Sequence, residues 1–282
     1  STISSTIGIY LFYLLVLDWY DKNIAYKSLI FLLAFPTTFF FGLIYSEGIF
    51  FMLIMIFFYL LNKKSVFFAS LTSFFLPFTR LIGIFIFIPF LSWYIFEFKK
   101  MTLYDQVDKI AQKLFEKKAL LILSPIIGLI MVCLFFYFST GNIFAQFSAQ
   151  KQFVSQYSAF LLLNPFLFVG EFFKFPMALQ GFTNSIFDRI FFVGFIAVLF
   201  FMRRRVSVTL FVFSVIFGIL PVLTGSFMSY TRYVSIVFPM YIVLAKMTEE
   251  KRYNFLNFPL LFIFTLFQTF FIVMHSLNHW IA

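Results

Sequence analysis

The chain consists of long apolar runs separated by short hydrophilic gaps, and this pattern limits its possible folds more than any other feature. A helix needs about 20 apolar residues to cross the hydrocarbon core of a bilayer. Of the 282 residues, 62% are hydrophobic and 11% are charged, so a soluble fold has too little interior to bury them. The pattern predicts a single all-α domain over 1–282, a polytopic transmembrane helical bundle. About ten hydrophobic segments are expected, at 3–17, 27–45, 48–62, 65–79, 81–98, 119–139, 184–202, 206–225, 233–246 and 255–277.

The stretch 65–98 is largely apolar, and Arg80 lies at its middle. Its length suits either one very long tilted helix or two short ones. Pro77 and Gly83 flank Arg80, and both residue types disfavour an uninterrupted helix. We therefore expect two crossings that meet near Arg80.

The distribution of lysine and arginine predicts the orientation in the membrane. Strict alternation of the segments places sixteen of the 21 basic residues on one side, which is assigned to the cytoplasm because cytoplasmic loops are rich in these residues. The alternation places the C-terminus outside, together with five basic residues, Arg80, Lys151, Lys174, Arg189 and Arg232. Membrane orientation thus accounts for the net charge of +10, and no nucleic-acid partner is expected.

Two hydrophilic stretches are longer than a turn. Residues 99–118 carry apolar side chains at helical spacing among lysines, which predicts an amphipathic helix on the cytoplasmic membrane surface. Residues 140–183 form a predicted external loop. Its second half combines apolar residues with prolines and charges, which favours an interfacial or re-entrant segment over a spanning helix.

Ionisable side chains at membrane depth are costly, so those on the external side are candidates for function. Glu47, Arg80 and Arg232 each lie at an external turn between apolar segments, and we expect one pocket to gather them. Each also has a structural explanation. Arg80 and Arg232 could anchor helix ends to lipid phosphates, and Glu47 could be a loop acid or the partner of an arginine.

The other external ionisable residues favour structural roles. Asp188 and Arg189 are adjacent at the start of a predicted helix, where a solvated pair is expected. His275 and His279 lie four residues apart, but no third ligand is near, so no metal site is expected. The sequence has no Walker, dinucleotide-binding, zinc-protease or nucleophile-elbow motif. A sugar or phosphate donor would therefore have to be carried on a lipid.

Five short motifs occur in order along the chain. They are FPTTFFFGLIYSEGIFFMLI (35–54), ASLTSFFLPFTRLIGIFIFIPF (69–90), GNIFAQFSAQKQF (141–153), TGSFMSYTRYVSIVFPMYIVLA (224–245) and HWIA (279–282). Together they resemble the motifs of the PIG-V-like mannosyltransferases, which are membrane glycosyltransferases of the GT-C class. The best-known member of that family adds the second mannose in GPI-anchor assembly.

The resemblance implies a GT-C fold that transfers a mannose-like sugar from a polyprenyl or dolichyl phosphate to an acceptor on the external or lumenal face. The membrane would be the plasma membrane of a prokaryote or the endoplasmic reticulum of a eukaryote. Arg80 and Arg232 suit the cations needed near the departing phosphate, and Glu47 suits the carboxylate needed near the acceptor hydroxyl. No cofactor is implied besides this lipid-phosphate donor. Substrate contacts are implied for Tyr45, Ser46, Gln150, Lys151, Tyr230 and Tyr233.

The chain departs from the family at its start. GT-C enzymes carry their key aspartate in the first external loop, whereas Asp18 and Asp21 fall on the cytoplasmic side here. We therefore expect that an N-terminal part precedes Ser1 in the parent protein, and Glu47 is then either the base or a residue that orients substrate. Two other functions stay open, a transporter or flippase of a lipid-linked sugar and a noncatalytic membrane subunit.

Overall fold

The computed structural model describes residues 1–97, 116–145, 148, 164–174, 185–223 and 227–279. These residues form helices joined by turns, with no β-strand among them. The N-terminal half contains α1 (Thr2–Trp19), α2 (Lys22–Ala34), η1 (Thr38–Phe41), α3 (Glu47–Asn62), α4 (Val66–Thr79), η2 (Leu81–Ile86), α5 (Phe87–Phe96), η3 (Lys117–Leu123) and α7 (Ser124–Thr140). The C-terminal half contains α9 (Pro165–Phe172), α10 (Ile186–Met202), α11 (Val208–Ile219), η5 (Leu220–Val222), α12 (Tyr230–Val234), α13 (Pro239–Glu249), η6 (Asn254–Leu256) and α14 (Asn257–Ser276).

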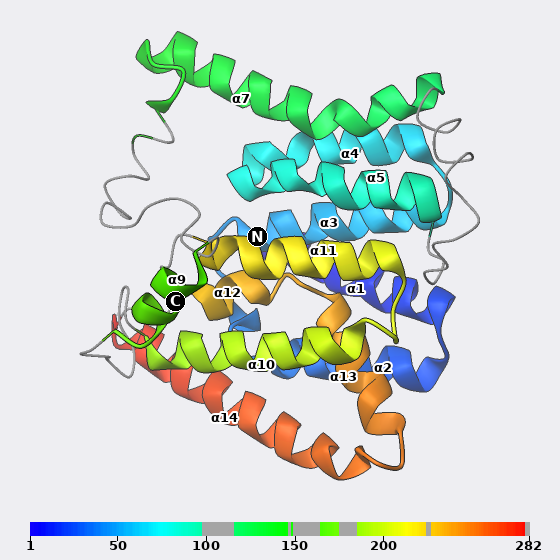
Figure 1. Ribbon diagram of the computed structural model, residues 1–282, viewed down its shortest axis with the longest axis vertical. Coiled ribbons are helices and arrows are strands. Elements are labelled where there is room, and N and C mark those ends of the chain that lie inside the picture. Colours follow the sequence, from blue (N-terminus) through cyan, green and yellow to red (C-terminus); the bar gives the residue numbers. More distant parts are fainter. Residues whose placement is uncertain (98–115, 146–147, 149–163, 175–184, 224–226, 280–282) are drawn as a thin grey trace.

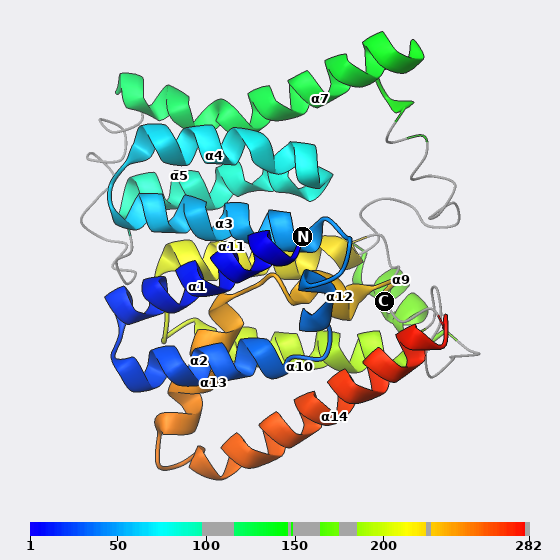
Figure 2. The ribbon, with the colours of Figure 1, turned by 180° about the vertical axis from the view of Figure 1, so that it is seen from behind.

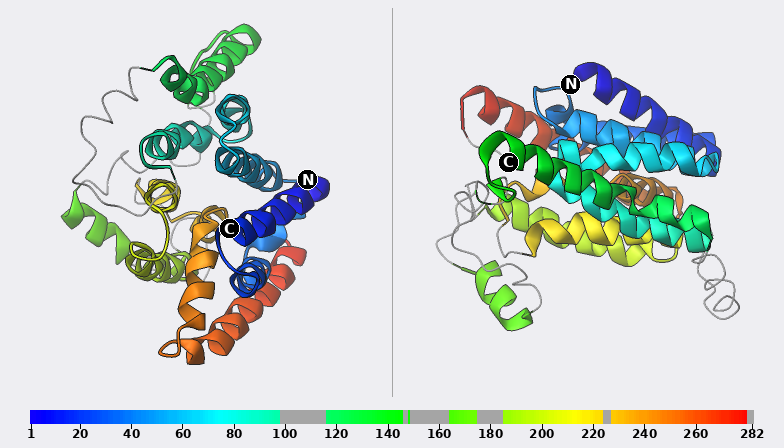
Figure 3. Two further views of the ribbon diagram at one scale, coloured as in Figure 1. Left: turned by 90° about the vertical axis from the view of Figure 1, so that its right-hand side faces the viewer. Right: turned by 90° about the horizontal axis from the view of Figure 1, so that it is seen from above.

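Most of the longer helices lie side by side, so that their ends gather at two opposite faces of the molecule (Figures 1 and 2). α7 lies along one edge against α4, and α14 lies along the opposite edge. Between these edges α4, α3, α1 and α2 contact one another in that order. α13 is the exception, because it runs across the direction of the other helices (Figure 3).

Aromatic side chains fill the core around the start of α13. The ring of Phe238 packs against Phe12, Phe58 and Phe213, with centroid distances of 6.0, 5.1 and 5.4 Å. Every residue from Pro239 to Ala245 is buried. Protein side chains, and not lipid, therefore surround the first half of α13.

Three helical stretches are long and apolar enough to cross a membrane, judged by length and composition. They are Thr2–Trp19, Lys118–Thr140 and Asn254–Ser276, and only 28%, 28% and 6% of their most apolar windows are buried inside the protein. Such exposed apolar surface requires an apolar solvent. These helices mark a membrane-associated protein. Shorter apolar helices accompany them at Glu47–Asn62, Val66–Thr79, Leu81–Phe96 and Val208–Val222.

The predicted break within 65–98 is confirmed. α4 ends at Thr79, Arg80 has an extended backbone, and η2 begins at the next residue. Gly83 lies against the end of α4, where an added Cβ would be 2.6 Å from the carbonyl carbon of Leu76. The two helices can therefore turn so sharply at Arg80 because glycine has no side chain.

Two predicted segments are wrong in extent. The segment 27–45 was expected to be helical throughout, but α2 ends at Ala34 because the residue before Pro36 disfavours helical geometry. The segment 233–246 is divided between α12 and α13, and α13 starts only at Pro239. This second error includes direction, since α13 crosses the other helices (Figure 1).

The predicted amphipathic helix at 99–118 lies almost wholly outside the described residues, as does most of the predicted external loop 140–183. Within that loop, α9 is a helix of eight residues, too short to cross a bilayer. Its Phe172 ring packs 5.5 Å from Phe227, so α9 is anchored to the segment that leads into α12.

Candidate functional site

Glu47, Arg80 and Arg232 each lie at or beside the end of a helix. Glu47 is the first residue of α3, where the positive end of the helix dipole favours a carboxylate. Arg80 caps the C-terminus of α4, where the dipole favours a cation. Arg232 belongs to α12, which follows Ser229, a residue with a left-handed φ of 58°. Residues other than glycine rarely adopt this backbone conformation. At Ser229 it directs the chain into α12.

Both guanidinium groups contact the same carboxylate oxygen. The Nε of Arg232 donates a hydrogen bond of 2.6 Å to Oε1 of Glu47. The Nη1 of Arg80 lies 2.8 Å from the same Oε1, as an ion pair that lacks hydrogen-bond geometry. The prediction that these three side chains converge is confirmed. Each arginine thus has an acidic partner, although no acid lies near either one in the sequence.

The three side chains form an ion cluster that is nearly closed to solvent. Glu47 has no exposed surface, and the arginine side chains are each 13% exposed. Two cations and one anion leave a net charge of +1. The second carboxylate oxygen of Glu47, Oε2, is buried and has no hydrogen-bond partner within the described parts of the chain. The ion cluster therefore carries one excess positive charge and one acceptor oxygen that the described residues leave without a partner.

Aromatic rings pack against the guanidinium groups of both arginines. The Cζ of Arg232 lies 4.2 Å from the ring centroid of Tyr45 and 4.7 Å from that of Phe40. The Cζ of Arg80 lies 4.7 Å from the ring centroid of Tyr233. Such cation–π contacts contribute up to about 2 kcal/mol where water is excluded. Tyr45 is 41% exposed, so it connects the buried cluster to the surface.

A buried hydrogen-bonded clamp fixes the residue before Arg232. Asp188 accepts hydrogen bonds of 2.7 Å from both the backbone N–H and the hydroxyl of Thr231. The hydroxyl of Thr37 donates a hydrogen bond of 2.9 Å to the carbonyl oxygen of Thr231. All three residues are buried, and hydrogen bonds are strong in such surroundings. The expected solvated pair of Asp188 and Arg189 is therefore wrong, because both side chains are buried.

Arg189 lies outside the ion cluster and donates hydrogen bonds to backbone carbonyl oxygens. Its Nε donates to the carbonyl oxygen of Phe172 at 2.8 Å, and its Nη1 donates to that of Ser185 at 3.0 Å. Its guanidinium group also lies over the ring of Phe227 at 5.0 Å. These contacts attach α9 to the start of α10.

The remaining predicted site residues have different positions. Tyr45 and Tyr233 lie against the arginines, whereas Tyr230 is buried and its hydroxyl donates to the carbonyl oxygen of Gly218 at 3.1 Å. Tyr230 therefore packs in the core with its hydroxyl bonded to the backbone, and its expected substrate contact stays a prediction. Ser46 precedes α3 and makes no side-chain capping bond. Gln150 and Lys151 lie outside the described residues.

His275 packs near aromatic rings at the same end of the molecule. Its ring centroid lies 5.9 Å from that of Phe39 and 5.5 Å from that of Phe40. Over the described ranges, no three His, Cys, Asp or Glu side chains come together in a way that could hold a metal ion.

The sequence alone does not indicate the clamp around Thr231. Ser185 and Asp188 have the spacing of a helix start, and the Oγ of Ser185 accepts a hydrogen bond of 3.2 Å from the Asp188 N–H. That spacing predicts where α10 begins but not where the carboxylate points. The one signal for Thr231 is its position next to Arg232.

Comparisons with known proteins add no relative. The chain matches no family model, no curated protein and no solved structure. Its function has to be inferred from the chemistry of the ion cluster and from the motifs that surround it.

Proposed function

We propose that this protein is a GT-C-type membrane glycosyltransferase that transfers a mannose-like sugar from a polyprenyl or dolichyl phosphate to an acceptor. The ion cluster of Glu47, Arg80 and Arg232 is the observation that carries this proposal. Its three members come from three of the motifs that resemble the PIG-V-like family. A largely buried cluster with net positive charge suits a phosphate, because charge-assisted hydrogen bonds to phosphate are strong.

Arg80 and Arg232 are assigned to the lipid phosphate. During transfer, the bond between the anomeric carbon and a phosphate oxygen breaks. The acceptor oxygen bonds to that carbon, and its proton leaves to a base. Negative charge grows on the departing phosphate, and a guanidinium group can hold two of its oxygens at once. The rings of Tyr45 and Tyr233 keep the two guanidinium groups oriented for this role.

Glu47 is assigned an orienting role. Both arginines contact its Oε1, which stabilises the ionised carboxylate and makes it a weak proton acceptor. Its Oε2 is free to accept a hydrogen bond from a hydroxyl of the sugar or of the acceptor. Removal of the acceptor proton then falls to another carboxylate, the role that the key aspartate fills in the resembling family.

The proposed protein is an integral, multi-pass membrane protein whose ion cluster faces the external or lumenal side. Its membrane is the plasma membrane of a prokaryote or the endoplasmic reticulum of a eukaryote. The lysine and arginine distribution along the chain supports this orientation. Its partners are membrane lipid, the lipid-linked sugar donor and an acceptor whose identity is open. No nucleotide or metal cofactor takes part.

The proposal is tested by sugar transfer from a radiolabelled polyprenyl-phosphate donor in membranes that contain the protein. Arg80→Ala and Arg232→Ala are each expected to slow transfer about 100-fold or more, since loss of one charge-stabilising donor costs roughly 2.7–4 kcal/mol. Arg→Lys at either position should recover only part of the rate, because an ammonium group cannot hold two oxygens in the same geometry. Arg189→Ala is the matched control, since it removes a buried arginine outside the ion cluster.

Each other outcome has a distinct meaning. Transfer at a near-normal rate by both alanine variants rules out the phosphate role of the arginines. Use of a nucleotide sugar without a lipid intermediate rules out the donor class. Movement of the lipid-linked sugar across the membrane without transfer identifies a flippase. Transfer that occurs only when a second protein is supplied identifies a noncatalytic subunit.

A further inference from the structure

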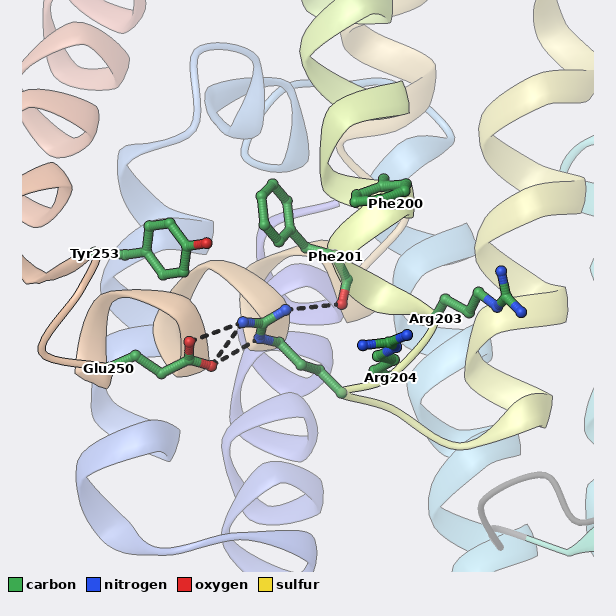
Figure 4. A pocket seen from close by; sticks show the side chains of 7 residues that line it. Phe200, Phe201, Arg203, Arg204, Glu250 and Tyr253 are labelled. Atoms are coloured by element: carbon green, nitrogen blue, oxygen red, sulfur yellow. Dashed lines mark hydrogen bonds and ion pairs between the residues drawn. The ribbon is translucent and has the colours of Figure 1, made fainter.

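A second group of arginines lies at the opposite end of α10 from the ion cluster. Asp188 and Arg189 are in the first turn of α10, and Arg203, Arg204 and Arg205 directly follow its last residue. These three arginines border a crevice of about 480 Å³ (Figure 4). Its other lining residues are Phe200, Phe201, Glu250 and Tyr253.

Among the described residues that line the crevice, Glu250 is the one acid, and it is already neutralised. Glu250 is bound by Arg205 through three hydrogen bonds, from Nε at 3.0 Å and from Nη2 at 2.7 and 2.9 Å. The neighbouring Glu249 is paired with Lys27 at 2.6 Å. The side chains of Arg203 and Arg204 are exposed, and they form no ion pair or hydrogen bond with other described residues. Two cations are therefore available at the crevice, and no acid among the described residues that line it is left to balance them.

The contacts of Arg205 fix the backbone at the end of α10, where Arg203 and Arg204 lie. Its Nη1 donates to the carbonyl oxygen of Phe201 at 3.2 Å, and its own carbonyl oxygen accepts a hydrogen bond of 2.8 Å from Lys246. Arg205 thus joins the end of α10 to α13. The backbone that carries Arg203 and Arg204 is fixed on one side by these contacts.

The surface next to the crevice is apolar and exposed. Phe200, which lines the crevice, is 81% exposed, and on the neighbouring C-terminal segment Phe255 and Phe258 are 71% and 76% exposed. Phe258 belongs to the stretch Asn254–Ser276, one of the three that could cross a membrane. A molecule bound at the arginines would therefore meet hydrocarbon-facing side chains next to its anionic group. This favours a lipid over a free anion.

We propose that this crevice binds the phosphate of an acidic membrane phospholipid, with Arg203 and Arg204 as its ligands. The lipid chains would lie along the exposed faces of α10 and α14. Arginine is suited to this role because its guanidinium group is planar and can bind two phosphate oxygens. Tyr253 adds an aromatic ring at the level of the headgroup, where such rings are common in membrane proteins. The site is independent of the ion cluster and of the proposed sugar transfer.

The test is native mass spectrometry of the full chain in detergent, titrated with phosphatidylglycerol and, separately, with phosphatidylcholine. One phosphatidylglycerol is expected to bind in preference to phosphatidylcholine. The double variant Arg203→Gln/Arg204→Gln should weaken that binding about tenfold or more, the effect of losing at least one charge-assisted hydrogen bond. The matched control is Lys251→Gln/Arg252→Gln, which removes the same charge from exposed residues nearby that do not line the crevice.

Several results would overturn the proposal. An equal loss in both double variants would mean that phosphatidylglycerol responds to diffuse charge and has no site at the crevice. Displacement of the lipid by inorganic phosphate at equal concentration would assign the crevice to a free anion. Equal binding of phosphatidylglycerol and phosphatidylcholine would show that the negative charge of the lipid headgroup does not determine binding. Glu47→Gln should leave the binding unchanged, which separates this site from the ion cluster, and unaltered thermal unfolding of the crevice variant would show that it is folded.

Discussion

The two ends of the helical bundle carry ion pairs of opposite character. At the end that includes the crevice, the described parts of the chain contain four partly exposed pairs. They are Lys27–Glu249 (2.6 Å), Lys63–Asp18 (3.0 Å), Lys64–Glu97 (3.5 Å) and Arg205–Glu250 (2.7 Å). At the other end, Glu47 is completely buried between Arg80 and Arg232.

This difference has an energetic meaning. Exposed ion pairs contribute little, because water solvates each charge almost as well as its partner does. A buried carboxylate has lost that water, so its arginines must compensate for a large desolvation cost. Apolar residues of similar volume would often be as stable or more stable at such a position. The buried end therefore carries charge that stability alone does not require, and this singles it out as the candidate site.

The largest expected effect is at the buried end, on removal of the Glu47 charge. Glu47→Gln leaves two guanidinium groups without a counter-ion, and it should lower the free energy of unfolding by about 3–5 kcal/mol. The measurement is unfolding in detergent micelles. A triple variant, Glu47→Leu/Arg80→Met/Arg232→Leu, should regain much of this stability while transfer stays absent. If the triple variant were active, the ion cluster would have no chemical role.

The second effect concerns the clamp behind the ion cluster. Asp188→Ala leaves the buried N–H and hydroxyl of Thr231 without an acceptor, which should cost about 2–3 kcal/mol of stability. Thr37→Val removes one neutral hydrogen bond and should cost about 1 kcal/mol. Sugar transfer measured beside unfolding should fall further for Asp188→Ala than for Thr37→Val, since Asp188 holds two groups of Thr231. An equal loss of activity in both variants would argue against this order.

The smallest effect is expected at the exposed end. In a double-mutant cycle of Lys27→Met and Glu249→Gln, the interaction energy should be below about 1 kcal/mol, because the side chains are 28% and 40% exposed. It should also decrease at high salt, which screens exposed charges. An interaction as large as that expected for Glu47 would remove the contrast between the two ends.

Much of the fold could be predicted from the sequence, because apolar runs, prolines and glycines determine where helices start and stop. The corner at Arg80 is an example, with Pro77 and Gly83 beside it. The course of α13 could not be predicted, because a helix buried in protein and a helix buried in lipid have the same apolar composition. The early end of α2 at Ala34 could have been predicted from Pro36, but the apolar composition of 27–45 favoured a longer helix.

The candidate site shows the same division. The meeting of Glu47, Arg80 and Arg232 could be predicted from the sequence. Charged side chains in short turns at the same face of a membrane bundle are stabilised by pairing with one another. The roles of Thr37 and Thr231 could not be predicted, since a buried threonine that binds a backbone group has no distinctive pattern around it. The burial of Tyr230 and its bond to the Gly218 carbonyl also could not be predicted, because its place in a motif next to Arg232 gives no sign of them.

The course of α13 has a mechanical consequence. One end of this helix leads through a short buried turn to Arg232, and the other end carries Glu249 and Glu250 with their ion pairs. The helix is buried over most of its length and cannot bend easily against its close-packed neighbours. It therefore acts as a rigid strut that keeps the turn leading to Arg232 and the ion pairs of Glu249 and Glu250 at a fixed separation.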